Sequence, residues 1–575
     1  MQRALSALIV VSLTFAAACG TDPGTEDAGS TDAGSTGAGS TGAGSIDGGL
    51  GSDAGQVVDG GDADVATDGG GDAATAMSGY AAVGTPTTHA AGRGEPPVVA
   101  WPKPAHAHPD VPFEFTMVAY DPDHDRLIFS LEGAPTGMEI DANGTITWEP
   151  TVDGSSHSFT VGVDDGRGEP VTVPVTLAVD ASLFVFVAPE GAEGATGTID
   201  APLADVDAAM RALTARDEGT LLIRGGTYDI TWNWEVGGVT SPFRNTDGTP
   251  DAPYVVRGYP GESVVLDCGE RGHGLWTFGG SYILHADIEV RGAAADERGG
   301  AILSGSHNVF QNVTVRDSNW SHTSNCTGFL MSGNDAVCHR CVAMDNYDRE
   351  SEHWNSSNYL VYTDRSVTGT VYIIDSFSSG SISGFKMKHA GEGRLVLHGN
   401  REVGSTYGWG GTDDGTTIRF NTFEDNDTGL SVAITDPSAS TRGGMLMEYN
   451  TVVGASRAFE VSQGFAQDGV TSRRNVFMLE RTPGSGESEP HYTWIHPWQD
   501  APSASILASE ENCFFGPADD TGFRFGRATG GFVEWRALGF DDGSRFADPM
   551  FVADSYAPGP SSACREAATR IGAWD

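Results

Sequence analysis

Two lysines stand in one short run, Gly384-Phe385-Lys386-Met387-Lys388-His389, and only three lysines occur among the chain's 33 lysine and arginine residues. Arginine keeps its proton in most settings, whereas lysine can lose it and act as a base. Alternate side chains of a strand share a face, so Phe385 and Met387 would face a core and both amines would lie on the outer face of a sheet. The run predicts an amine base on that face, and a solvated lysine pair without chemistry is the alternative.

The strands that would carry this run belong to a repeating pattern. A short apolar phrase recurs at steps of 25, 29, 80, 29 and 25 residues. Its copies are Asp287-Ile-Glu-Val, Asn312-Val-Thr-Val, Cys341-Val-Ala-Met, Asn421-Thr-Phe-Glu, Asn450-Thr-Val-Val and Asn475-Val-Phe-Met. Such a period, with one apolar strand in each copy, indicates a solenoid. The longest step leaves room for more coils, one of them through Asp375-Ser-Phe-Ser, and the recurring asparagine predicts a hydrogen-bonded ladder at a turn of each coil.

The chain from Phe184 onward opens with an apolar run, then an apolar-periodic helix over 203–215, then the strand-like run Thr220-Leu-Leu-Ile. This opening resembles that of right-handed parallel β-helix proteins, in which a helix caps the first coils. The resemblance implies an all-β fold in which residues 182–575 form a right-handed parallel β-helix.

Residues 95–181 show a different pattern, with alternating runs such as Gly144-Thr-Ile-Thr-Trp148 between turn residues. This is typical of a small β-sandwich. The run Ala119-Tyr-Asp-Pro-Asp-His-Asp125 resembles the Ig- and cadherin-like domains of bacterial surface proteins, which implies calcium at acidic loops. The candidate ligands are Asp121, Asp123, Asp125, Asp164 and Asp165. Aspartates that only form turns are the alternative.

The run Gly384-Phe385-Lys386, with an acidic stretch over 345–352 upstream of it, resembles polysaccharide lyase family nine, the pectate-lyase-like β-helix enzymes. The resemblance implies that Lys386 is the base and that Asp348 and Glu352 are calcium ligands. At two further ligand positions of that family this chain has Arg349 and Thr327. Two other acidic residues of the stretch would compensate, namely Asp345 and Glu350.

Elimination from a uronate explains these residue types. A base must remove the weakly acidic proton next to the uronate carboxylate, and Ca²⁺ on that carboxylate would stabilise the developing charge. Positive charge from Lys388, Arg349 or the metal would lower the pKa of Lys386. Nearby aromatic residues would suit sugar stacking: His353, Trp354, Tyr359, Tyr407 and Trp409. An exposed acidic turn beside a solvated strand is the structural alternative.

The first residues predict export. Arg3 precedes an apolar run over 4–18, which is too short for a comfortable membrane span of ~20 residues. Its end, Ala16-Ala17-Ala18-Cys19, resembles a bacterial lipobox and implies a signal peptide over 1–19 with lipidation at Cys19. Residues 20–94 consist largely of small and acidic residues, so we expect a disordered tether there. We therefore expect a lipoprotein of the outer membrane or cell surface, or a secreted protein if Cys19 is not lipidated.

The formal net charge of −45 argues against nucleic acid as a partner and suits a protein that collects calcium. Outside the cytoplasm, the six cysteines beyond Cys19 predict disulfides. We expect one bond within the group Cys326, Cys338 and Cys341, and another between Cys513 and Cys564. A zinc site at Cys338-x-x-Cys341 lacks a second ligand pair.

Two functions from different classes remain. One is a monomeric surface lipoprotein that acts on acidic polysaccharide as a calcium-assisted lyase with a lysine base. The other is a non-catalytic carbohydrate-binding or adhesion lipoprotein that uses the same tether and sandwich.

Overall fold

A computed structural model describes most of the chain after Arg93. The described residues are 94–100, 103–230, 242–243, 246–270, 273–277, 279–293, 300–318, 326–347, 356–363, 367–389, 393–412, 415–434, 444–463, 469–479, 491–496, 507–516, 522–525, 528–552, 556 and 558–565. All of them belong to one of two compact units, which spans 54–575. Cys19 and the predicted tether as far as residue 93 lie outside the described residues.

The predicted small sandwich forms from short, mainly antiparallel strands. One sheet has the order β2 (His106–Ala107), β9 (Val171–Val179), β8 (Ser155–Asp164) and β5 (Ile128–Glu132). A second has the order β3 (Phe113–Thr116), β7 (Thr145–Trp148) and β6 (Glu139–Ile140), and β1 (Val98–Val99) pairs with β4 (Ala119–Tyr120). Alternate residues of β8 and β9, such as Val161 and Leu177, are fully buried between the sheets. The Ig-like sandwich is thereby confirmed.

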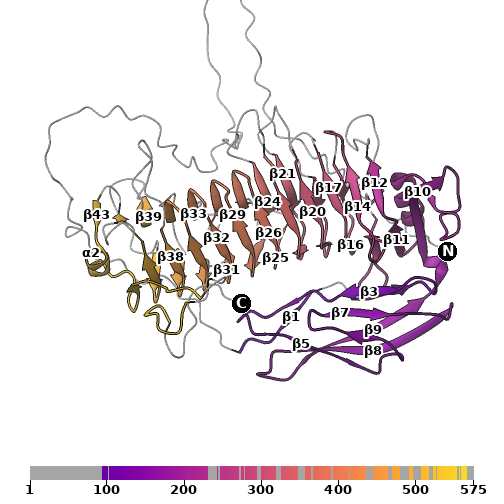
Figure 1. Cartoon of the computed structure of the whole chain (residues 1–575), viewed down its shortest axis with the longest axis horizontal. Coiled ribbons are helices and arrows are strands. Elements are labelled where there is room, and N and C mark those ends of the chain that lie inside the picture. Colours follow the sequence, from indigo (N-terminus) through magenta and orange to yellow (C-terminus); the bar gives the residue numbers. More distant parts are fainter. Residues whose placement is uncertain are drawn as a thin grey trace, which may run out of the picture. The chain divides into compact units, whose positions relative to one another are not determined.

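The rest of the described chain forms a parallel β-helix, in which successive coils add one strand to each of three sheets (Figure 1). The first sheet contains β10 (Phe184–Ala192), β11 (Gly219–Ile223), β13 (Tyr254–Gly258), β16 (Ile283–Ala286), β19 (Val309–Gln311), β22 (Val337–His339), β25 (Thr370–Ile374), β28 (Arg394–His398), β31 (Thr416–Arg419), β34 (Met445–Glu448), β37 (Val470–Arg473) and β40 (Leu507–Glu510).

The second sheet contains β12 (Gly226–Asp229), β14 (Val264–Asp267), β17 (Glu289–Arg291), β20 (Thr314–Arg316), β23 (Val342–Met344), β26 (Phe377–Ser379), β29 (Arg401–Val403), β32 (Thr422–Glu424), β35 (Thr451–Val453), β38 (Val476–Met478), β41 (Cys513–Phe515) and β44 (Arg545–Phe546). The third contains β15 (Leu275–Trp276), β18 (Ala301–Leu303), β21 (Thr327–Met331), β24 (Ser357–Thr363), β27 (Ser383–His389), β30 (Tyr407–Thr412), β33 (Thr428–Ile434), β36 (Arg457–Gln463), β39 (His491–His496), β42 (Phe523–Phe525) and β43 (Ala528–Gly530). Strands β26 and β29 fill the longest step of the sequence repeat.

A ladder of asparagines holds the turn between the first and second sheets. Its members are Asn400, Asn421, Asn450, Asn475 and Asn512, all essentially buried. In each of the four steps a backbone N–H donates to the side-chain oxygen of the next asparagine at 2.8–3.0 Å. A net value of roughly 0.5–1.5 kcal/mol per bond makes the ladder a real contribution to coil register. Asn312 is not part of it, because it sits one position earlier, at a φ of 50°, and donates to Asp287.

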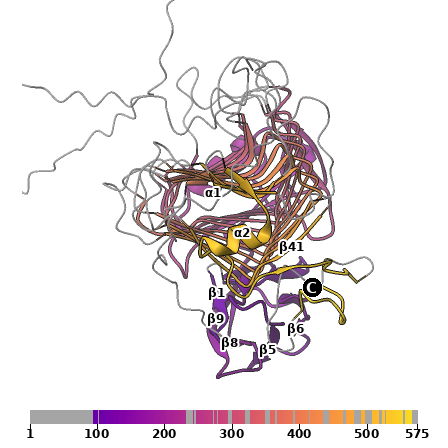
Figure 2. The same ribbon diagram turned by 90° about the vertical axis from the view of Figure 1, so that its left-hand side faces the viewer.

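Each end of the solenoid carries a helix. The predicted helix is α1 (Val206–Thr214), where the Asp205 side chain accepts a hydrogen bond from the Ala208 N–H and Met210 and Leu213 enter the core. At the other end α2 (Phe532–Ala537) contributes Trp535 to the same core. Figure 2 looks along the coils, with α2 across the end nearest the viewer. In the described part of the chain no helix combines the length and apolarity that a membrane crossing needs.

The sandwich packs on the outer face of the first sheet. Its core residues form one apolar cluster with Leu284, Val309 and Val337. Polar contacts fix the same junction: the Gln311 amide donates to the Thr116 carbonyl at 2.9 Å, and the Arg419 guanidinium donates to the Pro122 carbonyl at 3.3 Å. The outer face of the first sheet is therefore covered along much of its length.

Of the two disulfide predictions, one is confirmed and the other is wrong. Cys513 and Cys564 form a disulfide. Cys326, Cys338 and Cys341 are buried thiols, so the disulfide expected among them does not form. In place of a disulfide, the Cys326 thiol donates to the Ser318 carbonyl at 3.0 Å, and Cys338 and Cys341 both belong to the solenoid core.

Candidate active site on the third sheet

Strand β27 places the two lysines on the outer face of the third sheet. Phe385 and Met387 are each 1 % exposed and belong to the solenoid core, as predicted. The Phe385 ring stacks on that of Tyr359 in the neighbouring strand, with centroids 4.9 Å apart. This buried contact fixes the strand's register and turns Lys386 and Lys388 outward. Lys386, however, is only 9 % exposed, so the alternative interpretation, a solvated lysine pair, does not describe this side chain.

Burial is what shifts the acidity of these amines. It lowers the pKa of Lys386 to about 7, and the nearby ammonium of Lys388 adds to the effect. Leu360 stands next to Lys386 in the parallel register and is itself buried, which helps to remove water from the amine. Burial also lowers the pKa of Lys388, to about 8. The sequence led us to expect neighbouring charge as the cause, whereas desolvation contributes more.

The glycine at position 384, two residues before Lys386, is required by the packing of the solenoid interior. A side chain at Gly384 would collide with the Glu402 side chain, whose Cγ lies 2.2 Å from the position that a Cβ would occupy. Glu402 lies inside the solenoid with no exposed surface, and its carboxylate accepts hydrogen bonds from the Ser405 N–H at 3.1 Å and from the Asn426 amide. Burial raises the pKa of Glu402 to about 7. A buried carboxyl therefore lies directly behind the start of β27.

The outward row that contains Lys386 continues across the following strands. The parallel register aligns Lys386 with Gly410, Ser431, Glu460, Trp494 and Arg524 in turn. The Glu460 carboxylate lies 3.1 Å from the ring nitrogen Nε2 of His491 and 3.3 Å from the Arg457 guanidinium. No local pattern in the sequence indicates these residues, because only the coil register brings them into one row.

Most of the predicted calcium ligands of this site fall outside the described residues: Asp348, Glu350 and Glu352. Asp345 is described, and it occupies a turn after β23 with a φ of 54°. Asp317 and Asp425 occupy the equivalent turn in other coils, also with positive φ. Aspartate tolerates this conformation well, so the turn conformation is enough to explain why an aspartate occupies position 345.

The expected sugar-stacking aromatics are partly wrong. Tyr359 and Trp409 have no exposed surface and belong to the solenoid core, because their positions match the inward side chain of Phe385 in the register. Tyr407 is partly exposed, and His353 and Trp354 lie outside the described residues.

The acidic loop of the sandwich brings three of its predicted ligands together. Carboxylate oxygens of Asp121, Asp123 and Asp125 lie within 4.8 Å of one another. Asp121 is 3 % exposed; its Oδ1 accepts two backbone N–H bonds, and its Oδ2 is buried without a hydrogen-bond partner. Burial raises the pKa of Asp121 to about 6. Asp165 does not join them, since its carboxylate accepts a hydrogen bond from the Arg167 N–H in its own turn.

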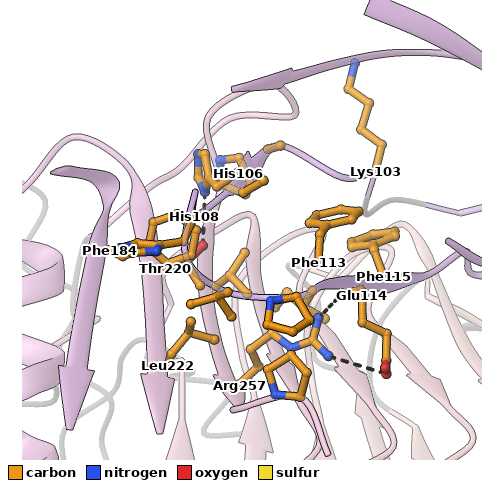
Figure 3. A pocket seen from close by; sticks show the side chains of 18 residues that line it. Lys103, His106, His108, Phe113, Glu114, Phe115, Phe184, Thr220, Leu222 and Arg257 are labelled. Carbon is orange, nitrogen blue, oxygen red and sulfur yellow. Dashed lines mark hydrogen bonds and ion pairs between the residues drawn. The ribbon is translucent and has the colours of Figure 1, made fainter. Parts of the chain in front are cut away.

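A pocket lies at the junction between the sandwich and the first sheet (Figure 3). His106 closes one side through the Thr220 hydroxyl at 3.2 Å and the Glu218 carboxylate at 2.9 Å. Phe113, Phe184 and other apolar side chains line much of the rest, together with the charged side chains of Lys103, Glu114 and Arg257. It is remote in topology from the third sheet, so we assign it to packing between the modules.

Comparison with known proteins agrees with this architecture. Residues 185–415 match the family model "Pel9A-like, right handed beta helix region", and residues 96–180 match "Putative Ig domain". Pectate lyase PEL9 of Emericella nidulans is 29% identical over 255 residues, which is 43% of this chain and 51% of that protein. The chain thus spans about half the length of this curated relative.

Two solved structures are also similar. The crystal structure of pectate lyase Pel9A shares 20% identity over 51% of this chain and 75% of its own, with a TM-score of 0.38. A rhamnogalacturonan lyase shares 14% identity over 57% and 87%, with a TM-score of 0.42. The strand pairing described above shows that residues 185–415 lie within a parallel β-helix, and the same residues match the Pel9A-like right-handed β-helix model, preceded by an Ig-like domain.

Proposed function

We propose that the solenoid is a lyase that cleaves an acidic polysaccharide by β-elimination, with Lys386 as the base. The observation that carries the proposal is the place of Lys386, an amine held at the outer face of the third sheet and largely shielded from water. Its lowered pKa leaves part of the amine neutral near neutral pH, which a base requires. The similarity to pectate lyase PEL9 supports this reaction class.

In this reaction the neutral Lys386 amine takes the proton from the carbon beside the uronate carboxylate. The electron pair forms a carbon–carbon double bond, the bond to the leaving sugar oxygen breaks, and that oxygen takes a proton from water. Lys386 then returns its proton to solvent, so nothing is consumed. The Gly410 position beside it carries no side chain, which leaves space for the substrate against the amine.

Calcium at this sheet would neutralise the uronate carboxylate and make the neighbouring proton more acidic. Of the candidate ligands there the structure describes Asp345 alone, and the turn accounts for that residue. We therefore derive the proton transfer from the lysines and assign no step to a metal.

The direct test is incubation of the purified protein with a panel of polyuronates and calcium while following the ultraviolet absorbance of the unsaturated product. Growth of absorbance with at least one polyuronate is expected. Calcium-dependent binding of glycan with no absorbance change on any substrate would instead favour the adhesion function.

We also propose that the sandwich binds Ca²⁺ at Asp121, Asp123 and Asp125. Ca²⁺ takes oxygen ligands, and three carboxylates already converge here with the buried Oδ2 of Asp121 lacking a hydrogen bond. A cation there would offset the cost of burying that charge. Because His124 in the same loop stacks on Phe420 of the solenoid at 4.7 Å, an ordered loop would also stabilise the junction between the modules.

Finally, we propose that the protein is a surface lipoprotein held by a lipid on Cys19. The apolar run that ends at Cys19 and the small-residue tether after it support this placement. Cys19→Ser should move the protein from the membrane fraction to the soluble fraction, and unchanged membrane partitioning would remove the anchor from the proposal.

A further inference from the structure

Strand β24 carries an exposed aromatic side chain next to the lysine site. Tyr362 is 44 % exposed, and it is the one aromatic residue among the large apolar side chains that are exposed in the described part of the chain. The parallel register pairs it with Lys388 and pairs Leu360, two positions earlier, with Lys386. All four side chains point away from the solenoid core, because alternate residues of a strand share a face. Tyr362 and the proposed base therefore lie on the same outer face.

The place of Tyr362 is fixed by the opposite face of its strand. Tyr359 and Val361 have no exposed surface and belong to the solenoid core. The Tyr359 ring stacks between those of Phe329 and Phe385, with the centroids 4.9 Å apart on each side. A shift of one residue in the register would turn this buried stack outward. The packing inside the coil thus holds Tyr362 outside it.

The spacing of the sheet puts the Tyr362 ring within reach of a sugar chain bound at Lys386. The two residues lie on neighbouring strands, ~4.8 Å apart, and Tyr362 is two positions beyond the partner of Lys386, which adds about 6.6 Å along the strand. Their Cα atoms are therefore separated by roughly 8 Å. One bound polymer can contact both side chains at that separation.

A pyranose ring suits a flat aromatic partner. Its hydroxyl groups lie at the edge of the ring, and C–H groups cover its faces. An aromatic side chain can bury such a face while the hydroxyl groups keep their hydrogen bonds to water. Tyrosine supplies this area at a low cost in conformational entropy, since its side chain has only two rotatable torsions. Single exposed apolar side chains are common on protein surfaces, but this one lies beside the amine at which the polysaccharide must bind.

We propose that the Tyr362 ring is a stacking platform for the sugar unit next to the one that loses its proton to Lys386. This inference rests on the proposed function. The ring holds the polymer against the third sheet and takes no part in proton transfer. Recognition at this position uses the apolar face of the sugar, so the unit on Tyr362 needs no carboxylate, in contrast to the unit at Lys386. The protein should therefore accept a neutral or an esterified sugar there.

The test is steady-state kinetics of Tyr362→Ala and Tyr362→Phe on the polyuronate that the panel identifies. A contact made equally in the bound substrate and in the transition state changes KM and leaves kcat alone. Tyr362→Ala should raise KM several-fold, up to about tenfold, with kcat unchanged. Tyr362→Phe keeps the ring and should behave like the intact protein. Ile128→Ala is the matched control, because Ile128 is 57 % exposed on β5 of the sandwich.

Salt separates stacking from a role through charge. Salt screens the interactions between exposed charges, whereas the contact of an apolar sugar face with an aromatic ring involves no charge. The ratio of KM between Tyr362→Ala and the intact protein should therefore be the same at low and at high sodium chloride. A ratio that falls towards one at high salt would show an electrostatic role through Lys388, and the platform would be wrong. If Tyr362→Ala fails to fold, Tyr362→Leu removes the flat ring with a smaller loss of apolar area and takes its place.

The outcomes separate the two proposals. If the intact protein cleaves polyuronate and Tyr362→Ala keeps its KM, or loses kcat alone, the platform is wrong and the lyase function stands. If the intact protein binds a polyuronate and cleaves none, the proposed function fails, and isothermal titration calorimetry of the same variants with that polymer decides the platform. If it neither cleaves nor binds any polyuronate, both proposals fail. A rise in KM that Tyr362→Phe does not share supports the platform.

Discussion

At the scale of single residues, burial decides what Lys386 can do. An exposed lysine is almost wholly protonated at neutral pH, whereas the low exposure of this amine brings its pKa to about 7. Lys388, two positions on, lies on the same face and is less buried, with a pKa of about 8. The two lysines therefore differ in environment, and their roles can be separated by substitution.

Lys386→Arg should lower the rate of unsaturated-product formation by roughly 10²–10⁴-fold, because a guanidinium stays protonated and cannot accept the substrate proton. Lys388→Arg should cost much less, since its positive charge is retained. Initial rates of both variants on the substrate found by the panel provide the measurement. Equal rates for the two variants would exclude Lys386 as the base.

The pH dependence follows from the same amine. Only the neutral form accepts a proton, so kcat/KM should fall about tenfold for each pH unit below about 7 and level off above it. Rates measured from pH 5 to pH 9 at fixed ionic strength would show this acid limb. A profile that stays flat down to pH 5 would mean that the essential base is a group with a lower pKa.

At the scale of elements, β27 and β29 meet around a buried acid. Glu402 of β29 fills the space beside Gly384, so the start of the lysine strand depends on a carboxyl group inside the solenoid. Its pKa, raised by burial to about 7 from 4.5, means that the folded protein keeps a proton that the unfolded chain releases between these values. The unfolding free energy therefore decreases as pH rises through this window.

Glu402→Gln should remove this part of the pH dependence, on the order of 2–3 kcal/mol between pH 4.5 and pH 7.5. The measurement is the free energy of unfolding in urea at a series of pH values. The slope of this free energy against pH is compared between the two proteins, because the substitution also changes the absolute stability when the Ser405 N–H loses a charged acceptor. Parallel curves for the protein with and without the substitution would show that Glu402 is ionised in both states.

At the scale of the whole molecule, the sandwich and the lysine site occupy different sheets of the solenoid. The sandwich covers the outer face of the first sheet, and the junction pocket there is lined mainly by apolar and histidine side chains. The third sheet carries the two lysines and the outward row that runs from Lys386 to Arg524. Calcium in the sandwich would thus act on stability and on the junction, separately from the reaction.

Calcium should raise the melting temperature, because an ion that binds the folded state alone stabilises it by about 2.7 kcal/mol at a hundredfold excess over its Kd. Asp121→Asn should abolish most of this rise. Asp141→Asn is the control, since Asp141 also accepts N–H bonds from residues two and four positions on but lies outside the cluster. An Asp121→Asn protein that still responds fully to calcium would place the ion elsewhere.

The sequence by itself determined the solenoid, the sandwich, the capping helix and the inward direction of Phe385 and Met387, because these follow from local periodicity and turn residues. It also indicated most of the asparagine ladder, whereas the Cys513–Cys564 pair was one expected pairing among several that the sequence left open. It could not show that Tyr359 and Trp409 are buried, because their inward direction follows from the register that aligns both with Phe385 in the neighbouring strand. Nor could it show the burial that lowers the pKa of Lys386, or the row that ends at Arg524. These depend on which residues of different coils share a register position, and that register is set by the lengths of the turns and by side-chain packing in the assembled fold.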